Sequence, residues 1–156
     1  MDDSDLVIGN FVYRRDERKI QKRKDLIWLH GKIYKRDFLD KNKIKFNNSR
    51  ANEDNGFNRL ILFMKPKYKF LDEYVYVYNE NSNSITRKNN RLYKLNGIEG
   101  FCYNMTWAVE QAILRGIPKD NFKIFYLDVL AALYMYYLNF EKEYDVNKII
   151  KWGKKI

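Results

Sequence analysis

The chain has 156 residues, of which 46% are hydrophobic, 17% aromatic and 32% charged, and its formal net charge at pH 7 is +10. This length is typical of one domain, so we expect a single domain over residues 1–156, and the apolar content excludes a chain that is disordered by composition. Two prolines and seven glycines exclude collagen-like and low-complexity architectures. The single cysteine, Cys102, excludes an internal disulfide and a zinc site built from several thiolates.

The same features bear on where the protein is found. The N-terminal sequence MDDSD is acidic and lacks the basic and apolar regions of a signal peptide. Together with the single cysteine, it predicts a soluble protein of a reducing compartment, the cytoplasm, or the host cell cytoplasm if the chain is viral. The most apolar stretch, residues 124–140, is short for a membrane span and contains Asp128 and Asn139, so we expect a buried core element and no membrane partner.

The N-terminal part is expected to be rich in strands. LVIGNFVY, residues 6–13, is β-branched and aromatic and predicts a first strand. The basic run at residues 14–24 fits a solvated helix, a long hairpin arm or a mobile loop, and we favour the first two. LIWLHGKIY, residues 26–34, predicts two short strand pieces hinged at His30 and Gly31.

The middle of the chain continues this pattern. Residues 50–58 have the Asn, Asp and Gly content of a surface loop, and RLILFM, residues 59–64, predicts a buried strand ended by Pro66. EYVYVY, residues 73–78, alternates as a strand does. The segments 85–88 and 91–95 flank an Asn-Asn pair that suits a hairpin turn. These elements predict an antiparallel meander.

Helices are expected towards the C-terminus. The apolar spacing after Asn104 predicts a helix capped by that residue and ended by Gly116 and Pro118. Residues 122–127 fit either a strand leading into a helix capped by Asp128 or part of one long helix from Pro118, and we favour the strand. Residues 141–156 predict a basic helix whose buried side is formed by Val146, Ile149, Ile150 and Trp152. The expected fold class is therefore α+β, an antiparallel β meander in the N-terminal and central part packed against two to three C-terminal helices.

Few residues suggest catalysis. His30 is the only histidine, and a hairpin histidine with a satisfied hydrogen bond is the simplest interpretation, so neither a catalytic triad nor a histidine metal site is expected. Asp128 interrupts the most apolar run, where a charge must be paired, capped or part of a site, and a helix N-cap is the leading interpretation. The glycines of NGIEG, residues 96–100, form only a weak phosphate-loop signal. We therefore expect no catalytic residue, no metal and no cofactor, and we favour a protein that is not an enzyme.

Two resemblances to enzyme families concern the same region. The stretch from Asn96 to Phe140, with glycines before a helix, a Gly after it, FYLDV and then LNF, resembles the cofactor-binding half of a GNAT acetyltransferase. The same helix followed by IFYLD resembles the second half of an RNase H-like domain. Both cover under a third of the chain. The first departs from its family at LNF, where a glycine is expected before phenylalanine, and the second has no carboxylate in its first strand.

The charge is concentrated in one segment. Residues 14–45 contain thirteen Lys and Arg against five Asp and Glu, and KIYKRDF, KIKF and KPKYKF set cations beside aromatic rings. Cations for phosphates and flat rings for bases are what nucleic-acid binding requires. Scattered solvated charge and the codon bias of an AT-rich genome explain the same composition. The residues we expect to bind nucleic acid or another anionic partner are Arg14, Arg15, Arg18, Lys19, Lys22, Arg23, Lys24, Lys32, Lys35, Arg36, Lys65, Lys67 and Lys69.

The sequence therefore predicts a small, basic, non-enzymatic protein that contacts the phosphate backbone of nucleic acid. The alternative is a protein–protein inhibitor or accessory factor, such as one encoded by a virus or mobile element, that docks on a nucleic-acid-handling complex. A divergent acetyltransferase-like or RNase H-like domain comes third. The choice between DNA and RNA and the oligomeric state stay open.

Overall fold

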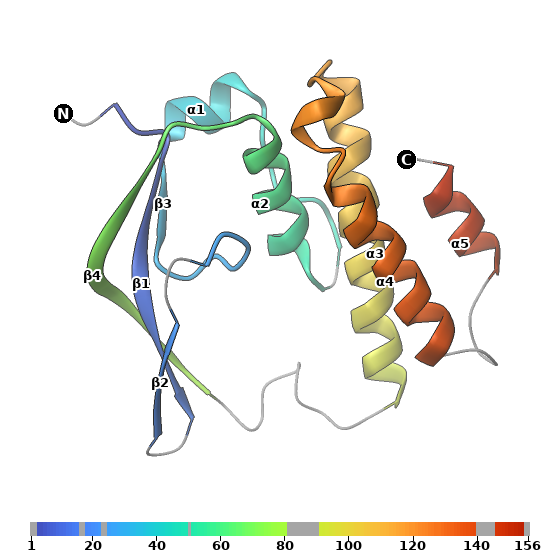
Figure 1. Cartoon of the computed structure of the whole chain (residues 1–156), viewed down its shortest axis with the longest axis horizontal. Coiled ribbons are helices and arrows are strands. Elements are labelled where there is room, and N and C mark those ends of the chain that lie inside the picture. Colours follow the sequence, from blue (N-terminus) through green and yellow to red (C-terminus); the bar gives the residue numbers. More distant parts are fainter. Residues whose placement is uncertain are drawn as a thin grey trace. The chain divides into compact units, whose positions relative to one another are not determined.

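The computed structural model in Figure 1 describes residues 3–15, 18–22, 25–49, 51–80, 91–139 and 146–154. The chain forms two compact units. The first, here called the sheet unit, comprises Met1–Lys45 and Pro66–Lys88, and the second, the helix unit, comprises Phe46–Lys65 and Asn89–Ile156. The expectation that all 156 residues make one domain stays a prediction.

A mixed sheet forms the sheet unit, with strand β1 (Leu6–Arg15) at its centre. On one side β1 pairs antiparallel with β3 (Lys32–Tyr34) near its start and with β2 (Arg18–Lys22) near its end. On the other side it pairs in parallel with the long strand β4 (Tyr68–Asn79). A short helix, α1 (Arg36–Lys41), follows β3.

The β-branched and aromatic residues of β1 explain its central position. Leu6, Ile8 and Phe11 are buried, as a strand flanked on both sides requires. Gly9 lies under Val75 of β4, because a Cβ atom at position 9 would come within 2.5 Å of the Val75 Cγ2 atom. Only glycine permits so close an approach of the two strands.

An irregularity in β4 lies opposite Asn10. The register shifts between Ile8 and Asn10 and again between Asn10 and Phe11, so β4 contains extra residues there. The Asn10 side chain is buried, and its Nδ2 donates to the backbone oxygen of Asp72 at 2.6 Å. This bond ties β1 to β4 at the point where the register shifts.

The helix unit contains α2 (Glu53–Phe63), α3 (Arg91–Leu114), a 3-10 turn η2 (Lys119–Asn121), α4 (Phe125–Asn139) and α5 (Val146–Gly153). Their buried apolar residues recur at helical spacings. In α3 these are Cys102, Met105, Ala108, Val109 and Ala112, and in α4 they are Val129, Ala132 and Tyr136. Gly116, with φ of +66°, follows the end of α3, as the sequence predicts.

A buried asparagine joins α3 to the chain that precedes α2. Asn104 is fully buried, and its Nδ2 donates to the Ser49 hydroxyl at 2.9 Å, to the Ala51 backbone oxygen at 2.9 Å and to the Gly100 backbone oxygen at 2.8 Å. Its Oδ1 accepts from the Asn47 side chain. These bonds hold Asn47, Ser49 and Ala51 against α3, and they replace the predicted role of Asn104 as a helix cap.

The α+β class with C-terminal helices is confirmed. So is the preference for a helix or hairpin arm in the basic run, for its described residues 14–15 and 18–22, where β1 and β2 pair as a hairpin. The sheet is mixed, because the chain leaves it through α1 and α2 and returns in β4 parallel to β1. Among residues 26–34 only β3 is a strand, and Gly31 with φ of +68° makes the turn before it.

The predicted strand at residues 59–64 and the predicted loop at residues 50–58 are wrong. Both belong largely to α2, whose buried residues Phe57, Leu60 and Ile61 follow a helical spacing that begins inside the supposed loop. The strand interpretation considered only the apolar run RLILFM, which is too short to distinguish a strand from a helix. Pro66 follows the helix by three residues.

Helix α3 begins thirteen residues before the predicted start. Residues 91–95, predicted as a strand, and NGIEG at residues 96–100, considered as a weak phosphate-binding signal before a helix, are both helical. Two glycines and an asparagine disfavour a helix locally, but α3 packs closely on Ala51 at Gly100, and such tertiary packing outweighs a local preference. The other half of the predicted hairpin, residues 85–88, lies outside the described residues.

The favoured strand at residues 122–127 is wrong as well. The chain there leaves η2 and enters α4 at Phe125, so Asp128 lies in the first turn of the helix and does not cap it. Residues 122–127 therefore lack the strand on which both enzyme resemblances depend. Helix α5 lies within the predicted C-terminal helix. Ile150, predicted on its buried side, is 48% exposed, and the side chains of Val146, Ile149 and Trp152 lie outside the described ones. Among the described residues, none of the helices combines the length and hydrophobicity needed to cross a bilayer.

Candidate nucleic-acid interface

A layer of aromatic side chains lies on one face of the sheet unit. Phe11 and Tyr13 of β1 face the same side as Tyr76 and Tyr78 of β4, because Phe11 pairs with Tyr76 and Tyr13 with Tyr78. Two further rings come from the segment between β2 and β3. The layer, here called the aromatic face, consists of Phe11, Tyr13, Trp28, His30, Tyr76 and Tyr78.

The rings of this face form two stacks. His30 lies parallel to Tyr76, with 5.0 Å between the ring centroids and 5° between the planes. Tyr13 lies parallel to Tyr78, with 5.2 Å between centroids and 10° between planes. The two stacks touch where His30 meets Tyr78 at 4.7 Å. Offset stacks of this kind are favourable and hold each ring in one orientation.

Trp28 and His30 are positioned by a turn that the sequence encodes locally. The Asp25 carboxylate accepts hydrogen bonds from the backbone N–H groups of Ile27 at 2.8 Å and Trp28 at 2.6 Å. The Gly9 N–H then donates to the Gly31 backbone oxygen at 2.8 Å, which fixes the end of the segment to β1. An aspartate side chain that accepts hydrogen bonds from the backbone amides two and three residues further along is a common feature of turns.

The aromatic face is only partly closed. Phe11 is fully buried beneath Trp28 and His30, with ring centroids 5.9 Å and 5.5 Å away. Tyr76 is 43% exposed, and the other four rings are half-buried. Five of the six rings are therefore partly accessible to solvent, while Phe11 is packed beneath them.

A hairpin of cationic residues continues from this face. In the register of β1 and β2, Arg14 lies opposite Lys19 and Arg15 opposite Arg18, and Lys22 lies opposite Phe11. The register therefore places four cationic positions immediately beyond Tyr13 and its partner Ile20 in the sheet. Arg14 is exposed.

The other predicted cations are dispersed. Lys32 is half-buried, and its amine donates to the Trp28 backbone oxygen beside the aromatic face. Arg36 and Lys69 are exposed in the same unit. Lys65 is exposed but belongs to the helix unit. Arg23 and Lys24 lie outside the described residues.

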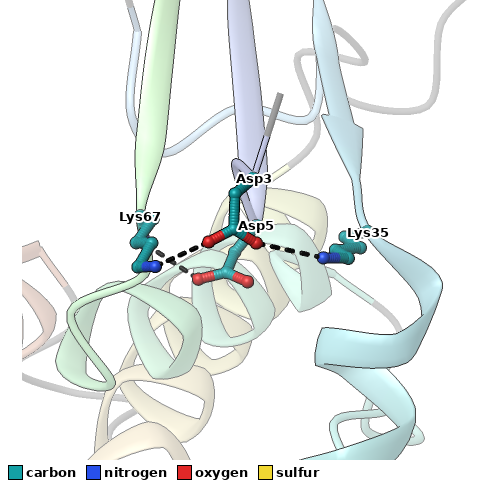
Figure 2. A network of polar contacts seen from close by, with 4 residues as sticks. All are labelled: Asp3, Asp5, Lys35 and Lys67. Carbon is teal, nitrogen blue, oxygen red and sulfur yellow. Dashed lines mark hydrogen bonds and ion pairs between the residues drawn. The ribbon is translucent and has the colours of Figure 1, made fainter. Parts of the chain in front are cut away.

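Two of the predicted cations have an internal counterion, shown in Figure 2. The Asp3 carboxylate lies 2.7 Å from the Lys67 amine and 3.6 Å from the Lys35 amine, so it links the start of β4 to the end of β3. Asp5 accepts from the Lys67 backbone N–H at 2.9 Å. Lys35 and Lys67 therefore contribute less positive charge to the surface than the sequence suggests.

These contacts change proton affinities in opposite directions. The hydrogen bond and charge of Lys67, with a smaller contribution from Lys35, lower the pKa of the Asp3 carboxyl below its ordinary value of 3.8. The same bond raises the pKa of Lys67. Both side chains are exposed to water, so the pair is a weak contribution to stability at ordinary salt concentrations.

The sequence did not reveal the aromatic face. We expected His30 to be a hairpin histidine, and Trp28, Tyr13 and Tyr78 were not candidates. The alternation of aromatic residues at positions 11 and 13 and at positions 76 and 78 carries the signal. It becomes informative only once the parallel pairing of β1 with β4 is known.

Comparison of the chain with known protein families, with curated proteins and with solved structures finds no match.

Proposed function

We propose that the protein binds single-stranded nucleic acid without catalysing a reaction, with the β1–β2 hairpin on the phosphates and the aromatic face on the bases. The observation that supports this most directly is the juxtaposition of stacked, partly exposed rings with a hairpin of opposed cations. Base stacking on an aromatic ring contributes about 1–3 kcal/mol per base and tolerates any sequence. Phosphate contacts by Lys and Arg provide the remaining affinity and make it dependent on salt.

The hairpin is tested by reversing its charge. We expect the variant Arg14→Glu, Arg15→Glu, Arg18→Glu and Lys19→Glu to lose most binding to labelled mixed-sequence DNA and RNA single strands in fluorescence anisotropy at about 50 mM salt. The slope of log affinity against log salt should fall by about 3, since each phosphate contact on a single strand contributes about 0.7.

A control variant makes the same change in net charge elsewhere. The four residues chosen are exposed cations of the helix unit, Lys94, Lys119, Lys151 and Lys154, each replaced by Glu. This variant should keep most of the binding and most of the salt slope. Equal losses in the two variants would mean that net charge alone attracts nucleic acid, and no binding by the unaltered chain at low salt would end the proposal.

The aromatic face is tested separately with Tyr76→Val, which keeps a residue suited to a strand. Removal of one stacking ring should weaken binding about 5- to 150-fold, which corresponds to about 1–3 kcal/mol. The salt slope should stay unchanged, because a tyrosine releases no counterion. A variant that binds as tightly as the parent would show that the bases do not contact this face.

A protein partner is the second candidate, and exposed apolar residues on α4 favour it. Leu127, Leu130, Tyr134 and Leu138 are each more than half exposed, at 69%, 57%, 60% and 52%. Docking of this helix on a nucleic-acid-handling protein, as an inhibitor or accessory factor would dock, predicts a stoichiometric partner in a pull-down from the native host. Retention of that partner after nuclease treatment supports this candidate, and its loss supports direct nucleic-acid binding.

A further inference from the structure

The helix unit contains a pocket that the proposed nucleic-acid interface does not use. Its volume is about 500 Å³, and helices α2, α3 and α4 line it. Its polar side chains are those of Asn52, Arg59 and Asp128, and Ile98, Phe101 and Met135 supply much of its apolar wall. The pocket is open to solvent on one side, and a mainly apolar hollow between helices with a few polar groups is a common form of a small-molecule site.

Arg59 and Asp128 form an ion pair in which the two members are buried to different extents. The Arg59 Nη1 atom lies 2.8 Å from the Asp128 Oδ2 atom. The arginine side chain is 11% exposed, whereas the aspartate side chain is 49% exposed. The accessible charge of the pocket is therefore the carboxylate, and the guanidinium lies deeper.

Further contacts hold the arginine in place. Its guanidinium carbon lies 4.5 Å from the centre of the Phe125 ring, a cation–π distance. Its Nε atom is buried and, among the described residues, finds no hydrogen-bond acceptor. Burial lowers the pKa of Arg59, and the Asp128 charge offsets part of this effect. A packed and partly desolvated arginine fixes the position of the carboxylate in front of it.

Asn52 at the start of α2 completes the frame. It has φ of +60°, a left-handed conformation that asparagine tolerates better than most residues. Its Nδ2 donates to the Gly97 backbone oxygen at 2.8 Å, which ties the start of α2 to α3 at the edge of the pocket. Polar contacts within the chain therefore hold the walls of the pocket in place before any ligand binds.

We propose that this pocket binds a small organic amine, with its ammonium group on the Asp128 carboxylate and its apolar body against Ile98, Phe101 and Met135. A carboxylate with its counterion behind it presents the negative end of a dipole, which attracts a cationic donor and repels an anion. An aromatic wall at Phe101 also favours a cation. The net positive charge of the chain acts from a distance and is screened within about 8 Å at physiological salt.

The test uses four ring compounds of similar size that differ in one group: benzylamine, p-cresol, toluene and benzoate. Binding to the full chain at pH 7 is followed by NMR through the methyl groups of Ile98 and Met135. Benzylamine should bind about tenfold more tightly than toluene, the ratio that one charge-assisted hydrogen bond of about 1.4 kcal/mol provides. p-Cresol should bind between these two, and benzoate should bind most weakly.

A variant assigns the preference to one carboxylate. Asp128→Asn should reduce the ratio of benzylamine to toluene affinity to about one, whereas the control Asp120→Asn, at an exposed aspartate of η2, should leave it unchanged. The ranking on the unaltered chain remains informative if Asp128→Asn does not fold. The proposal would be overturned if benzoate bound as tightly as benzylamine, or if no compound changed the signal of either methyl group. It would also be overturned if the preference for benzylamine over toluene survived Asp128→Asn.

Discussion

Replacement of the two glycines of α3 by alanine tests the helix packing with a single added carbon atom at each site. Gly97 and Gly100 lie three residues apart in the same helix, within the stretch NGIEG. A Cβ atom at Gly97 would meet no other atom within 4 Å. A Cβ atom at Gly100 would lie 2.7 Å from the Ala51 backbone oxygen and 3.1 Å from the Ala51 Cβ atom.

Two effects of known size compete at these positions. Alanine is favoured over glycine inside a helix by about 0.5–1 kcal/mol, and both variants gain this amount. Overpacking costs about 1–3 kcal/mol, and only Gly100→Ala incurs it. The Ala51 oxygen cannot move away freely, because it accepts the Asn104 hydrogen bond at 2.9 Å. We therefore expect Gly97→Ala to be more stable than the parent and Gly100→Ala to be about 1–3 kcal/mol less stable than Gly97→Ala.

Urea unfolding followed by circular dichroism at 222 nm measures this difference, since α3 and α4 supply most of the described helix. In thermal unfolding, 1 kcal/mol corresponds to about 2–4 °C for a chain of this length. The helix preference is common to both variants, so the difference between them isolates the contact with Ala51. Equal stability of the two variants, or a more stable Gly100→Ala, would refute the close approach of α3 to residue 51.

Three further outcomes are expected. Asn104→Ala should lower the free energy of unfolding by about 2–3 kcal/mol, because it removes a fully buried side chain together with its hydrogen bonds to Ser49 and Ala51. In the same assay Asn48→Ala, at an exposed position, should change it by under about 0.5 kcal/mol. Lys67→Met should raise the pKa of the Asp3 carboxyl towards 3.8 in an NMR titration, and an unchanged titration midpoint would contradict the pairing. Because the pKa of Asp3 is lower in the folded chain, the pair stabilises the fold at pH values above the pKa of the unfolded chain, and this stabilisation is lost as the pH falls through the pKa of the folded chain. Burial raises the pKa of the Cys102 thiol to about 12, so this thiol should react with a disulfide reagent at pH 8 only when the chain unfolds. Rapid reaction of the native chain would show that solvent reaches the core at Cys102.

Local chemistry was enough to predict several elements. The β-branched run at residues 6–13 and the alternation at residues 73–78 form strands wherever they pair, because their side chains suit a pleated surface. Gly116 ends α3 because it provides the positive φ that follows a helix. The concentration of charge at residues 14–24 is a property of composition, so it needed no fold to be recognised.

The aromatic face and the Arg59 pocket could not be predicted in this way. Each brings together residues from three separate segments, and which segments meet depends on pairing that a local pattern does not contain. Asp128 attracted attention in the sequence because it interrupts an apolar run. Its partner, Arg59, lies 69 positions earlier in a segment that the sequence predicts as a strand.

The sequence by itself determined which residues favour strands, where α3 ends, and that the chain is basic and rich in aromatic rings. Tertiary structure alone decided the secondary structure of the short apolar runs at residues 59–64 and 122–127. Such runs satisfy the hydrophobic period of a strand and of a helix equally well, so the choice is made by the surfaces on which they pack. It also decided that β4 runs parallel to β1, because the direction of a strand is set by the path of the chain between the two and not by the strand's own residues.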